Sequence, residues 1–490
     1  MSPRRTFLLA FLAYFLLAGA WALALPVNGT YDEKQHLVRA YAVWTGQFIP
    51  HERGVDATGL PADAIDGPRS LLPANADCTW WPKTERPKPA SCQEPVTDRG
   101  DTLMPTSAGR YSPVYYLLVG LPLRISPDGT GLIWARLLSA ALNALFLAAA
   151  AMIAVRLGNR LLLAALALVT TPLAIDLNGA INPNGLENTA GILLFVALMA
   201  ALKKPGGTQY LKMAGIAAAT LASVLHLGVV LALFLIFACF MIAGWPPVRD
   251  MLRSRAAWLW FGLPSIAGAL FAVGWLFGSG VLDITVPARP RQLSTGDILQ
   301  GLVTTRAEFY ARQIVAQFGY GETTVSPIMI FLWYILIAVI VVPALWLASW
   351  RVRLALAGIF VASYAILAGL ELHYAPLVGW YAHSRYVMPL GAAIVLGAAF
   401  VDRLVDDRLI LALVAITVPL QLYALARVMT RFQVGIDSGF DPFGGTWRPV
   451  AGPLLPLVLC LVGALLLAVM VKNPFVRRAP HLSTANTLSN

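Results

Sequence analysis

The amino-acid sequence predicts an all-α, polytopic transmembrane helical bundle with a large first extracytoplasmic loop. The chain has 490 residues, of which 58% are hydrophobic and only 12% are charged. That charged fraction is about half the value of an average soluble domain. The mean hydropathy is +0.69, and long apolar runs recur along the chain with basic clusters between them. One helical bundle that uses lipid as its solvent accounts for these observations.

The apolar runs predict about twelve membrane spans. They cover residues 6–25, 131–155, 161–177, 188–202, 211–226, 228–244, 256–279, 327–349, 353–371, 386–402, 409–427 and 453–471. The first run is longer than the apolar core of a signal peptide, so we favour a retained anchor over a cleaved leader. We expect residues 211–244 to form a hairpin of two short spans. The alternative is one broken helix that buries His226.

The net charge of +11 could indicate nucleic-acid binding, but the positions of the charges exclude it. Lys and Arg gather in short clusters between the apolar runs, at residues 4–5, 156–160, 203–212, 249–255, 351–353, 403–408 and 472–478. Basic clusters beside membrane spans mark cytoplasmic loops. Both termini are therefore expected in the cytoplasm. The sequence predicts one membrane-embedded domain, residues 1–475, which includes the outer loop 26–130, and a cytoplasmic tail, residues 476–490.

Two cysteines, Cys78 and Cys92, lie in the first outer loop. On an oxidising face of the membrane they are expected to form a disulfide, with two free thiols as the alternative. Cys239 and Cys460 lie in apolar runs and are expected to be packing residues.

A cluster of ionisable residues directly follows the first span: Asp32, Glu33, His36 and Arg39. If this segment is helical, Asp32, His36 and Arg39 lie near one face, because residues three and four apart are neighbours. Glu33 and His36 also have the spacing that can place a carboxylate and an imidazole on one metal ion. The alternative is a solvated helix start with its acidic residues at the positive end of the dipole.

A second polar group contains Asn182, Asn184 and Glu187, at the expected outer end of a span. A turn and a helix cap explain these residues without any ligand. Glu187 opens an apolar run, however, where an ionisable group is costly unless it is paired, and a substrate contact is the second interpretation.

A third group contains His383, Arg385 and Tyr386, and Arg110 lies on the same expected face. Arg385 stands at the outer mouth of a span, against the usual bias of positive charge toward the cytoplasm. Its planar guanidinium suits a phosphate group. An interfacial aromatic belt with a snorkelling arginine is the alternative.

Several classes of enzyme find no support in the sequence. The chain has no phosphate-binding G-x-x-x-x-G-K-[ST] loop, no G-x-S-x-G nucleophile elbow and no H-E-x-x-H zinc motif. Nucleotide-driven transport and serine or zinc hydrolysis are therefore not expected.

These groups, in this order, resemble a family of bacterial membrane proteins, domain-of-unknown-function family 2142. The resemblance rests on residues 32–40, 112–116, 182–187, 318–320 and 384–389 and spans about residues 7–471. The family is similar to the GT-C glycosyltransferases, which move a sugar from a polyprenyl-phosphate carrier on the outer face. The resemblance implies a bacterial inner-membrane protein, with Asp32 as the essential acid and Glu33 as its partner. Ser384 stands where the family pattern has glycine, and His383 has no counterpart that we can map.

The resemblance implies inverting transfer of a sugar to a glycan or lipid acceptor among membrane lipids. Asp32 is the expected general base, and Glu33 would orient the acceptor or help hold Mg²⁺ or Mn²⁺. Arg385, and next Arg110 or Arg39, would stabilise the phosphate leaving group. His36, Asn182, His383 and Tyr386 would contact the substrate. Glu187 and Asn184 would contact its hydroxyl groups.

Three other functions remain open on the sequence. The chain could join whole glycan units, as a polymerase or ligase does. It could instead be a transporter or flippase of lipid-linked glycans, for which His226 between two short runs is the best indication. It could also be a non-catalytic protein of envelope assembly, in which Asp32 would be dispensable.

Overall fold

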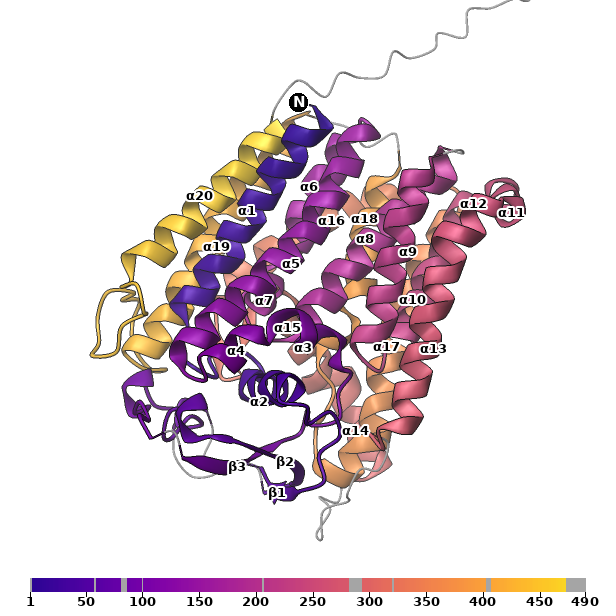
Figure 1. Cartoon of the computed structure of the whole chain (residues 1–490). Helices are drawn as coiled ribbons and strands as arrows, with labels where there is room; N and C mark the ends of the chain where they lie inside the picture. Colours follow the sequence, from indigo (N-terminus) through magenta and orange to yellow (C-terminus); the bar gives the residue numbers. More distant parts are fainter. Residues whose placement is uncertain are drawn as a thin grey trace, which may run out of the picture.

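The computed structural model describes residues 2–472 except 57–58, 81–85, 99, 205–206, 282–292, 320 and 402–406. A bundle of long helices is capped at one end by a smaller layer of short helices and strands (Figure 1). The N-terminus lies at the opposite end of the bundle from this end layer (Figure 1). Tyr320, Arg403 and the expected tail 476–490 lie outside the described residues.

The bundle contains most of the helices. They are α1 (Pro3–Ala24), α5 (Gly129–Arg156), α6 (Arg160–Val169), α7 (Pro172–Asn178), α8 (Pro183–Lys203), α9 (Thr208–Val224), α10 (Gly228–Ala243), α11 (Trp245–Arg253), α12 (Arg255–Ala257), α13 (Leu263–Gly278), α16 (Pro327–Leu347), α17 (Trp350–Val378), α18 (Met388–Ala399), α19 (Asp407–Gln433) and α20 (Leu454–Lys472). A π-helical turn, Trp258–Gly262, joins α12 to α13.

Eight of the described helices are long and apolar enough to cross a membrane, or up to ten if each of two bent pairs is one span. This is fewer than the expected twelve. All twelve apolar runs contain helix, but several are broken or short. The run 161–177 bends by 74° between α6 and α7, where Pro172 disfavours helical backbone at the residue before it. The helices α9 and α18 have only 17 and 12 residues.

Helices α9 and α10 pack against one another, with a break at residues 225–227 between them (Figure 1). This arrangement supports the predicted hairpin rather than a single broken helix. His226 lies in the break, and its ring meets the ring of Tyr111 edge-on at 5.0 Å between centroids.

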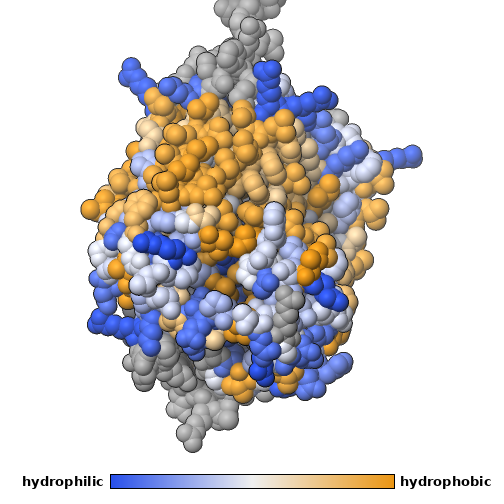
Figure 2. Space-filling view, turned by 60° about the vertical axis from the view of Figure 1, so that its left-hand side comes forward, coloured by the Kyte–Doolittle hydropathy of each residue, from blue (hydrophilic) through white to orange (hydrophobic). Residues whose placement is uncertain are grey.

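Helix α8 is the centre of the bundle and packs against α5, α9, α10 and α18. In the most apolar 18-residue stretch of α8, 94% of the residues are buried. In the corresponding stretch of the helix Arg255–Gly278, only 17% are buried. An apolar band crosses the side of the molecule in Figure 2, with hydrophilic side chains at its upper edge and over the end layer. The band is the surface that lipid would cover.

The end layer is built mainly from the first loop. It contains α2 (Glu33–Trp44), α3 (Pro113–Val119), α4 (Leu121–Ile125), β1 (Arg53–Val55), β2 (Pro61–Pro68) and β3 (Asp101–Thr106), with α14 (Thr295–Gly301), α15 (Ala307–Ala316), β4 (Gln317–Phe318) and β5 (Thr323–Thr324) from a later segment. The antiparallel sheet has the order β1-β2-β3, with Asp63 opposite Arg53 and Thr106. The all-α prediction did not include this sheet.

The same loop carries a disulfide between Cys78 and Cys92, whose Cα atoms are 6.2 Å apart. The isolated bridge between Ala74 and Glu94 joins the segments that flank the two cysteines. Cys239 and Cys460 are buried free cysteines.

Candidate active site

The candidate site is centred on Asp32, where the chain leaves α1 and enters α2. Asp32 is the N-cap residue of α2 and has left-handed backbone angles, φ 55° and ψ 12°. Asp and Asn adopt this conformation more readily than other residues with a side chain. The carboxylate makes no capping bond to the helix. Its Oδ2 instead forms an ion pair with Nη2 of Arg385.

Arg385 lies 353 positions after Asp32 in the sequence but next to it in space. It lies in the 3-10 turn η5, Ser384–Val387, directly before α18. Its guanidinium carbon lies 4.5 Å from the ring centroid of Tyr31 and 5.3 Å from that of Tyr386. The Arg385 side chain is 2% exposed, whereas that of Asp32 is 27% exposed. The pair therefore joins a buried cation to a carboxylate that an incoming molecule can reach.

Two nitrogen atoms of Arg385 are not used in hydrogen bonds within the part of the chain that the structure describes. Nε and Nη1 are buried and form no hydrogen bond among the described residues. Leaving such donors without a partner costs free energy. An anion placed against the guanidinium would satisfy them with charge-assisted hydrogen bonds. The site can thus hold a negative group beside the Asp32 carboxylate.

Glu33 does not share this site, although it is the next residue in the chain. Its carboxylate is fully buried and paired with Arg136 of α5, whose Nε lies 2.6 Å from Oε1. The backbone N–H of Ile181 donates to the same oxygen at 3.3 Å. Arg136 also donates to the carbonyl groups at the end of α1. Glu33 thus ties α1, α2 and α5 together.

The expected joint binding of an acceptor or metal ion by Asp32 and Glu33 does not fit this geometry, because the two carboxylates have different arginine partners. Among the residues that the structure describes, no group of three His, Cys, Asp or Glu side chains could hold a metal ion.

The other two arginines predicted to meet phosphate form hydrogen bonds within the protein. Arg39 is fully buried and donates to the carbonyl oxygens of Tyr111, Gln47 and Phe48. The Nε of Arg110 lies 3.2 Å from Oδ1 of Asp63, and its Nη1 donates at 2.9 Å to the carbonyl of Ser279 after α13. Both side chains hold the end layer together and onto the bundle.

The predicted polar residues of α8 are buried beneath the site. Asn182 caps α8 with its Oδ1 and donates through Nδ2 to the carbonyl of Tyr31 at 2.7 Å. Asn184 donates to Oε2 of Glu187 at 3.1 Å. Asn182 therefore positions the segment before Asp32. Asn184 and Glu187 contact one another inside the bundle, and Oε1 of Glu187 forms no hydrogen bond with the described residues.

His36 lies on α2, one turn after Asp32. Its Nδ1 is 2.8 Å from the hydroxyl of Tyr116, and the side chain is buried. Burial lowers the pKa of His36 to about 4; the charge of Asp32 opposes this shift and that of Arg385 adds to it. The imidazole is therefore neutral at physiological pH. Its ring packs against the rings of Tyr111 and Tyr116.

Aromatic side chains surround the ion pair. Tyr381 lies 4.3 Å from Tyr374 and 6.3 Å from Tyr386 between ring centroids. Burial raises the pKa of Tyr111 well above its usual range, with further contributions from Tyr386 and Asp32. Tyr111 therefore lies within electrostatic reach of the site, on the loop before α3. Rings of this kind stack on the apolar faces of ligands and keep polar edges available.

The loop that carries His383 and Arg385 is held by Arg306 and Glu371, which are not among the predicted site residues. Arg306 donates through Nε to Oε1 of Glu371 at 2.8 Å and through Nη2 to the carbonyl of Ala382. The other oxygen of Glu371 accepts the backbone N–H of Tyr381 at 2.9 Å. Glu371 is fully buried at the end of α17, and a carboxylate in an apolar helix is a sequence signal for such a partner.

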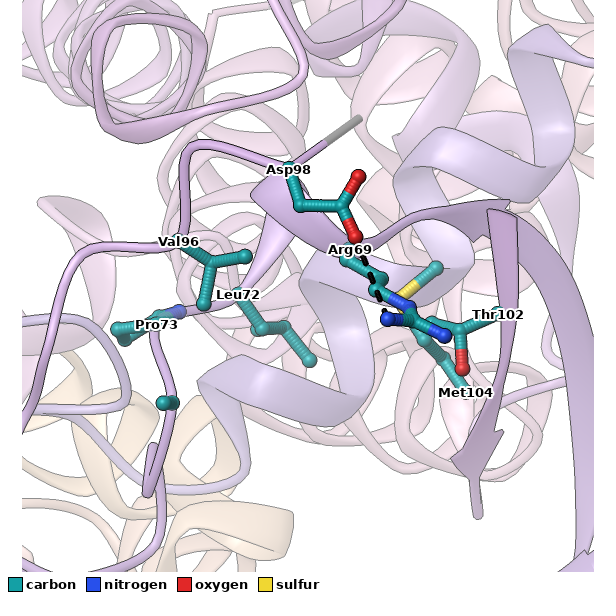
Figure 3. Close-up of a pocket in the computed structure, with 8 residues that line it drawn as sticks. Arg69, Leu72, Pro73, Val96, Asp98, Thr102 and Met104 are labelled. Atoms are coloured by element: carbon teal, nitrogen blue, oxygen red, sulfur yellow. Dashed lines mark hydrogen bonds and ion pairs between the residues drawn. The ribbon is translucent and has the colours of Figure 1, made fainter. Parts of the chain in front are cut away.

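A groove in the end layer is a separate feature. Its volume is about 440 Å³, and it is lined by Arg69, Leu72, Pro73, Ala74, Val96, Asp98, Thr102 and Met104 (Figure 3). Nη1 of Arg69 lies 3.2 Å from Oδ2 of Asp98, and both side chains are 57% exposed. None of the predicted site residues lines this groove, so the Asp32–Arg385 pair remains the candidate site.

The model of a family described as "Predicted membrane protein (DUF2142)" matches residues 15–394. Among solved structures, ArnT from Cupriavidus metallidurans bound to undecaprenyl phosphate is similar, with 14% sequence identity over 95% of this chain and 76% of that chain and a TM-score of 0.45. The apo state of ArnT is similar with 13% sequence identity over 92% of this chain and 74% of that chain, and the TM-score is 0.43. Similarity at this level carries no conclusion about the reaction. No curated protein matches the chain.

Proposed function

The chain belongs to the DUF2142 family of predicted membrane proteins, and on the geometry around Asp32 we propose that it is a membrane glycosyltransferase. Its donor is a sugar carried on a polyprenyl phosphate, and its acceptor is a hydroxyl group of an envelope glycan or lipid. The reaction is a single displacement with inversion at the anomeric carbon. The site would lie on the extracytoplasmic face of a bacterial inner membrane, an orientation that the basic clusters at the opposite ends of the spans favour.

Asp32 is the proposed general base. The acceptor hydroxyl is a poor nucleophile until its proton is removed, so a carboxylate within hydrogen-bond reach must accept that proton as the new bond forms. The new bond joins the acceptor oxygen to the anomeric carbon. The bond from that carbon to the phosphate oxygen breaks, and the electron pair leaves with the polyprenyl phosphate.

Arg385 is the proposed partner of the leaving group. Negative charge develops on the phosphate oxygen as the sugar departs, and a fixed cation in a site of low dielectric stabilises that charge. The observation that carries this proposal is that the partly exposed Asp32 carboxylate lies against a buried guanidinium with two unpartnered nitrogen atoms. Base and phosphate site thus belong to one site, and inversion would place the acceptor oxygen and the leaving phosphate oxygen on opposite faces of the anomeric carbon.

No step in this proposal uses a metal ion, because Asp32 and Glu33 do not share a coordination site. Tyr111, Tyr381 and Tyr386 supply ring faces for the sugar. Glu33, Arg39 and Arg110 hold the surrounding segments in place and have no direct part in the displacement.

The test compares wild-type protein with Asp32→Asn after reconstitution into vesicles with a panel of polyprenyl-phosphate sugars and glycan acceptors. Asparagine keeps the left-handed backbone and the size of the side chain, so the variant is expected to fold. Sugar transfer should fall about a hundredfold or more. Asp98→Asn, in an exposed pair of the same end layer, is the matched control and should retain activity.

Equal activity in wild type and Asp32→Asn would remove Asp32 as the base. If the wild type transfers no sugar from any donor but moves lipid-linked sugar across the vesicle membrane, the protein is a flippase. A folded protein that does neither would support the assembly role.

A further inference from the structure

Gln313 lies between the two halves of the candidate site. It belongs to α15, and its side chain is fully buried. It contacts Tyr31, the residue before Asp32, and also His383 and Ser384, the residues before Arg385. The hydrogen bonds of this glutamine do not depend on the proposed function, and only their effect on catalysis rests on it.

The orientation of the Gln313 amide is determined by its partners. The backbone N–H of Ser384 donates to Oε1 at 2.7 Å, and a backbone N–H is always a donor. The hydroxyl of Ser384 lies 3.0 Å from the same oxygen. Oε1 therefore faces Ser384, and the Nε2 amide group faces the opposite side.

A second contact confirms this orientation independently. The Tyr31 hydroxyl donates its only hydrogen to the carbonyl of Gln317 at 3.2 Å. It must then accept from Nε2 of Gln313, which lies 2.7 Å away. One hydrogen of the amide is used here, and the second remains for His383.

That second hydrogen determines the protonation of His383. Nε2 of Gln313 lies 2.8 Å from Nδ1 of His383. Because the amide nitrogen can only donate, Nδ1 must accept, and the proton of the neutral imidazole lies on Nε2. Burial lowers the pKa of His383 well below its usual range, and Arg385 acts in the same direction against the opposing charge of Asp32.

We infer that Gln313 fixes His383 as the Nε2–H tautomer, which donates a hydrogen bond to an oxygen of the substrate. Gln313 is thus a positioning residue, and His383 is a specificity residue beside the base and the phosphate site. With Nδ1 occupied and Nε2 protonated, His383 has no lone pair with which to act as a base.

The surroundings of His383 agree with a role at the site. Its ring lies 5.3 Å from Tyr31 and 5.7 Å from Tyr386 between centroids. Nε2 has no hydrogen bond within the described part of the chain, and it is not among the buried polar atoms without a partner. The N–H is therefore not fully enclosed by the protein. The same network explains Ser384, because its hydroxyl adds a bond to Gln313 that glycine lacks.

The direct test is the ¹⁵N spectrum of histidine-labelled full-length protein in lipid, with the His383 signals assigned by comparison with His383→Gln. In wild type, Nδ1 of His383 should appear as an unprotonated acceptor and Nε2 as a protonated nitrogen. In Gln313→Glu, a carboxylate oxygen replaces the amide nitrogen, so the proton should move to Nδ1 and the signals should exchange.

A wild-type spectrum with the proton on Nδ1, or an unchanged tautomer in Gln313→Glu, would overturn the inference. His36 and His373 serve as controls within the same spectrum, because His36 contacts Tyr116 and His373 packs against Tyr374. Their signals should not move in the folded variant. This readout does not depend on any enzymatic activity.

The catalytic consequence is tested by a matched pair of variants. The amide of glutamine can place an N–H near the position of Nε2, whereas the shorter asparagine reaches only the position of Nδ1. His383→Gln should retain at least about a tenth of the sugar-transfer rate, and His383→Asn should lose about a hundredfold. Equal losses in both would show that the donor has no catalytic role. If wild type has no transferase activity while the tautomer is as expected, the proposed function fails and the hydrogen-bond assignment stands.

Discussion

Asp32 and Glu33 are consecutive in the chain, yet their carboxylates pair with different arginines. Asp32 pairs with Arg385 of η5, and Glu33 pairs with Arg136 of α5. The left-handed backbone at Asp32 begins α2 and turns the two side chains apart. One carboxylate is thus partly exposed at the site, and the other is enclosed within the protein. Their functions separate in the same way, as a proposed base and a structural anchor.

Glu33→Gln should destabilise the protein strongly. The substitution leaves the buried Arg136 without a countercharge, and breaking a buried pair in this way costs about 3–5 kcal/mol. Thermal unfolding in detergent measures the effect. Asp98→Asn breaks an exposed pair and should cost less than about 1 kcal/mol. Similar losses in the two variants would contradict the structural role of Glu33.

Arg385→Lys should weaken the binding of polyprenyl phosphate about tenfold or more. Lysine keeps the charge but lacks the planar fork with which Nε and Nη1 would meet phosphate oxygens. Binding to protein in lipid nanodiscs measures the effect, with Arg110→Lys as the control because Arg110 already meets Asp63 and Ser279. An unchanged affinity in Arg385→Lys would remove this residue from the phosphate site.

Stability should decrease as the pH falls from 6.5 toward 4. The pKa of His36 is about 4 in the folded protein, so the unfolded chain binds the proton more tightly in this range. Stability is fully present above the unfolded pKa and is lost as the pH falls, by about 3 kcal/mol for this residue. Asp32 and Arg385 face His36 and act in opposite directions. His36→Asn should have a flatter pH profile, and an identical profile would exclude His36 as the source.

Removal of the disulfide should loosen the first loop. Cys78 and Cys92 close a loop of 14 positions, for which the entropic stabilisation is about 3 kcal/mol. The double variant Cys78→Ser, Cys92→Ser should unfold at lower temperature than wild type, and protease should cut the end layer sooner. Cys460→Ala, in α20, is a control for the loss of a thiol and should not speed that cleavage.

The sequence singled out both members of the ion pair, because both have unusual positions, but it did not predict that they contact one another. Asp32 lies in an ionisable cluster beside a span, and Arg385 lies on the face where arginine is disfavoured. Gln313 could not be found in this way. A single glutamine on a short helix has no pattern that distinguishes it, and its partners come from segments about 70 and 280 positions away.

Arg136 could have been recognised from the sequence. It lies inside a long apolar run, where a charged residue is expensive unless it has a partner. The sheet was harder to predict, since β2 contains Pro61, Gly67 and Pro68, which are poor strand residues. Fewer than twelve described helices meet the length and composition of a span, because an apolar run shows composition and does not show where a helix bends.

The position of α8 has a consequence for biogenesis. Almost all of this helix is covered by its neighbours, and α18, one of those neighbours, is synthesised about 200 residues later. Until α18 arrives, the α8 surface that it covers remains open to lipid or to other chains. Arg385 lies directly before α18 and 353 positions after Asp32. The same late insertion that shields α8 therefore completes the site, so a nascent chain that is still short of this helix carries the base without its cation.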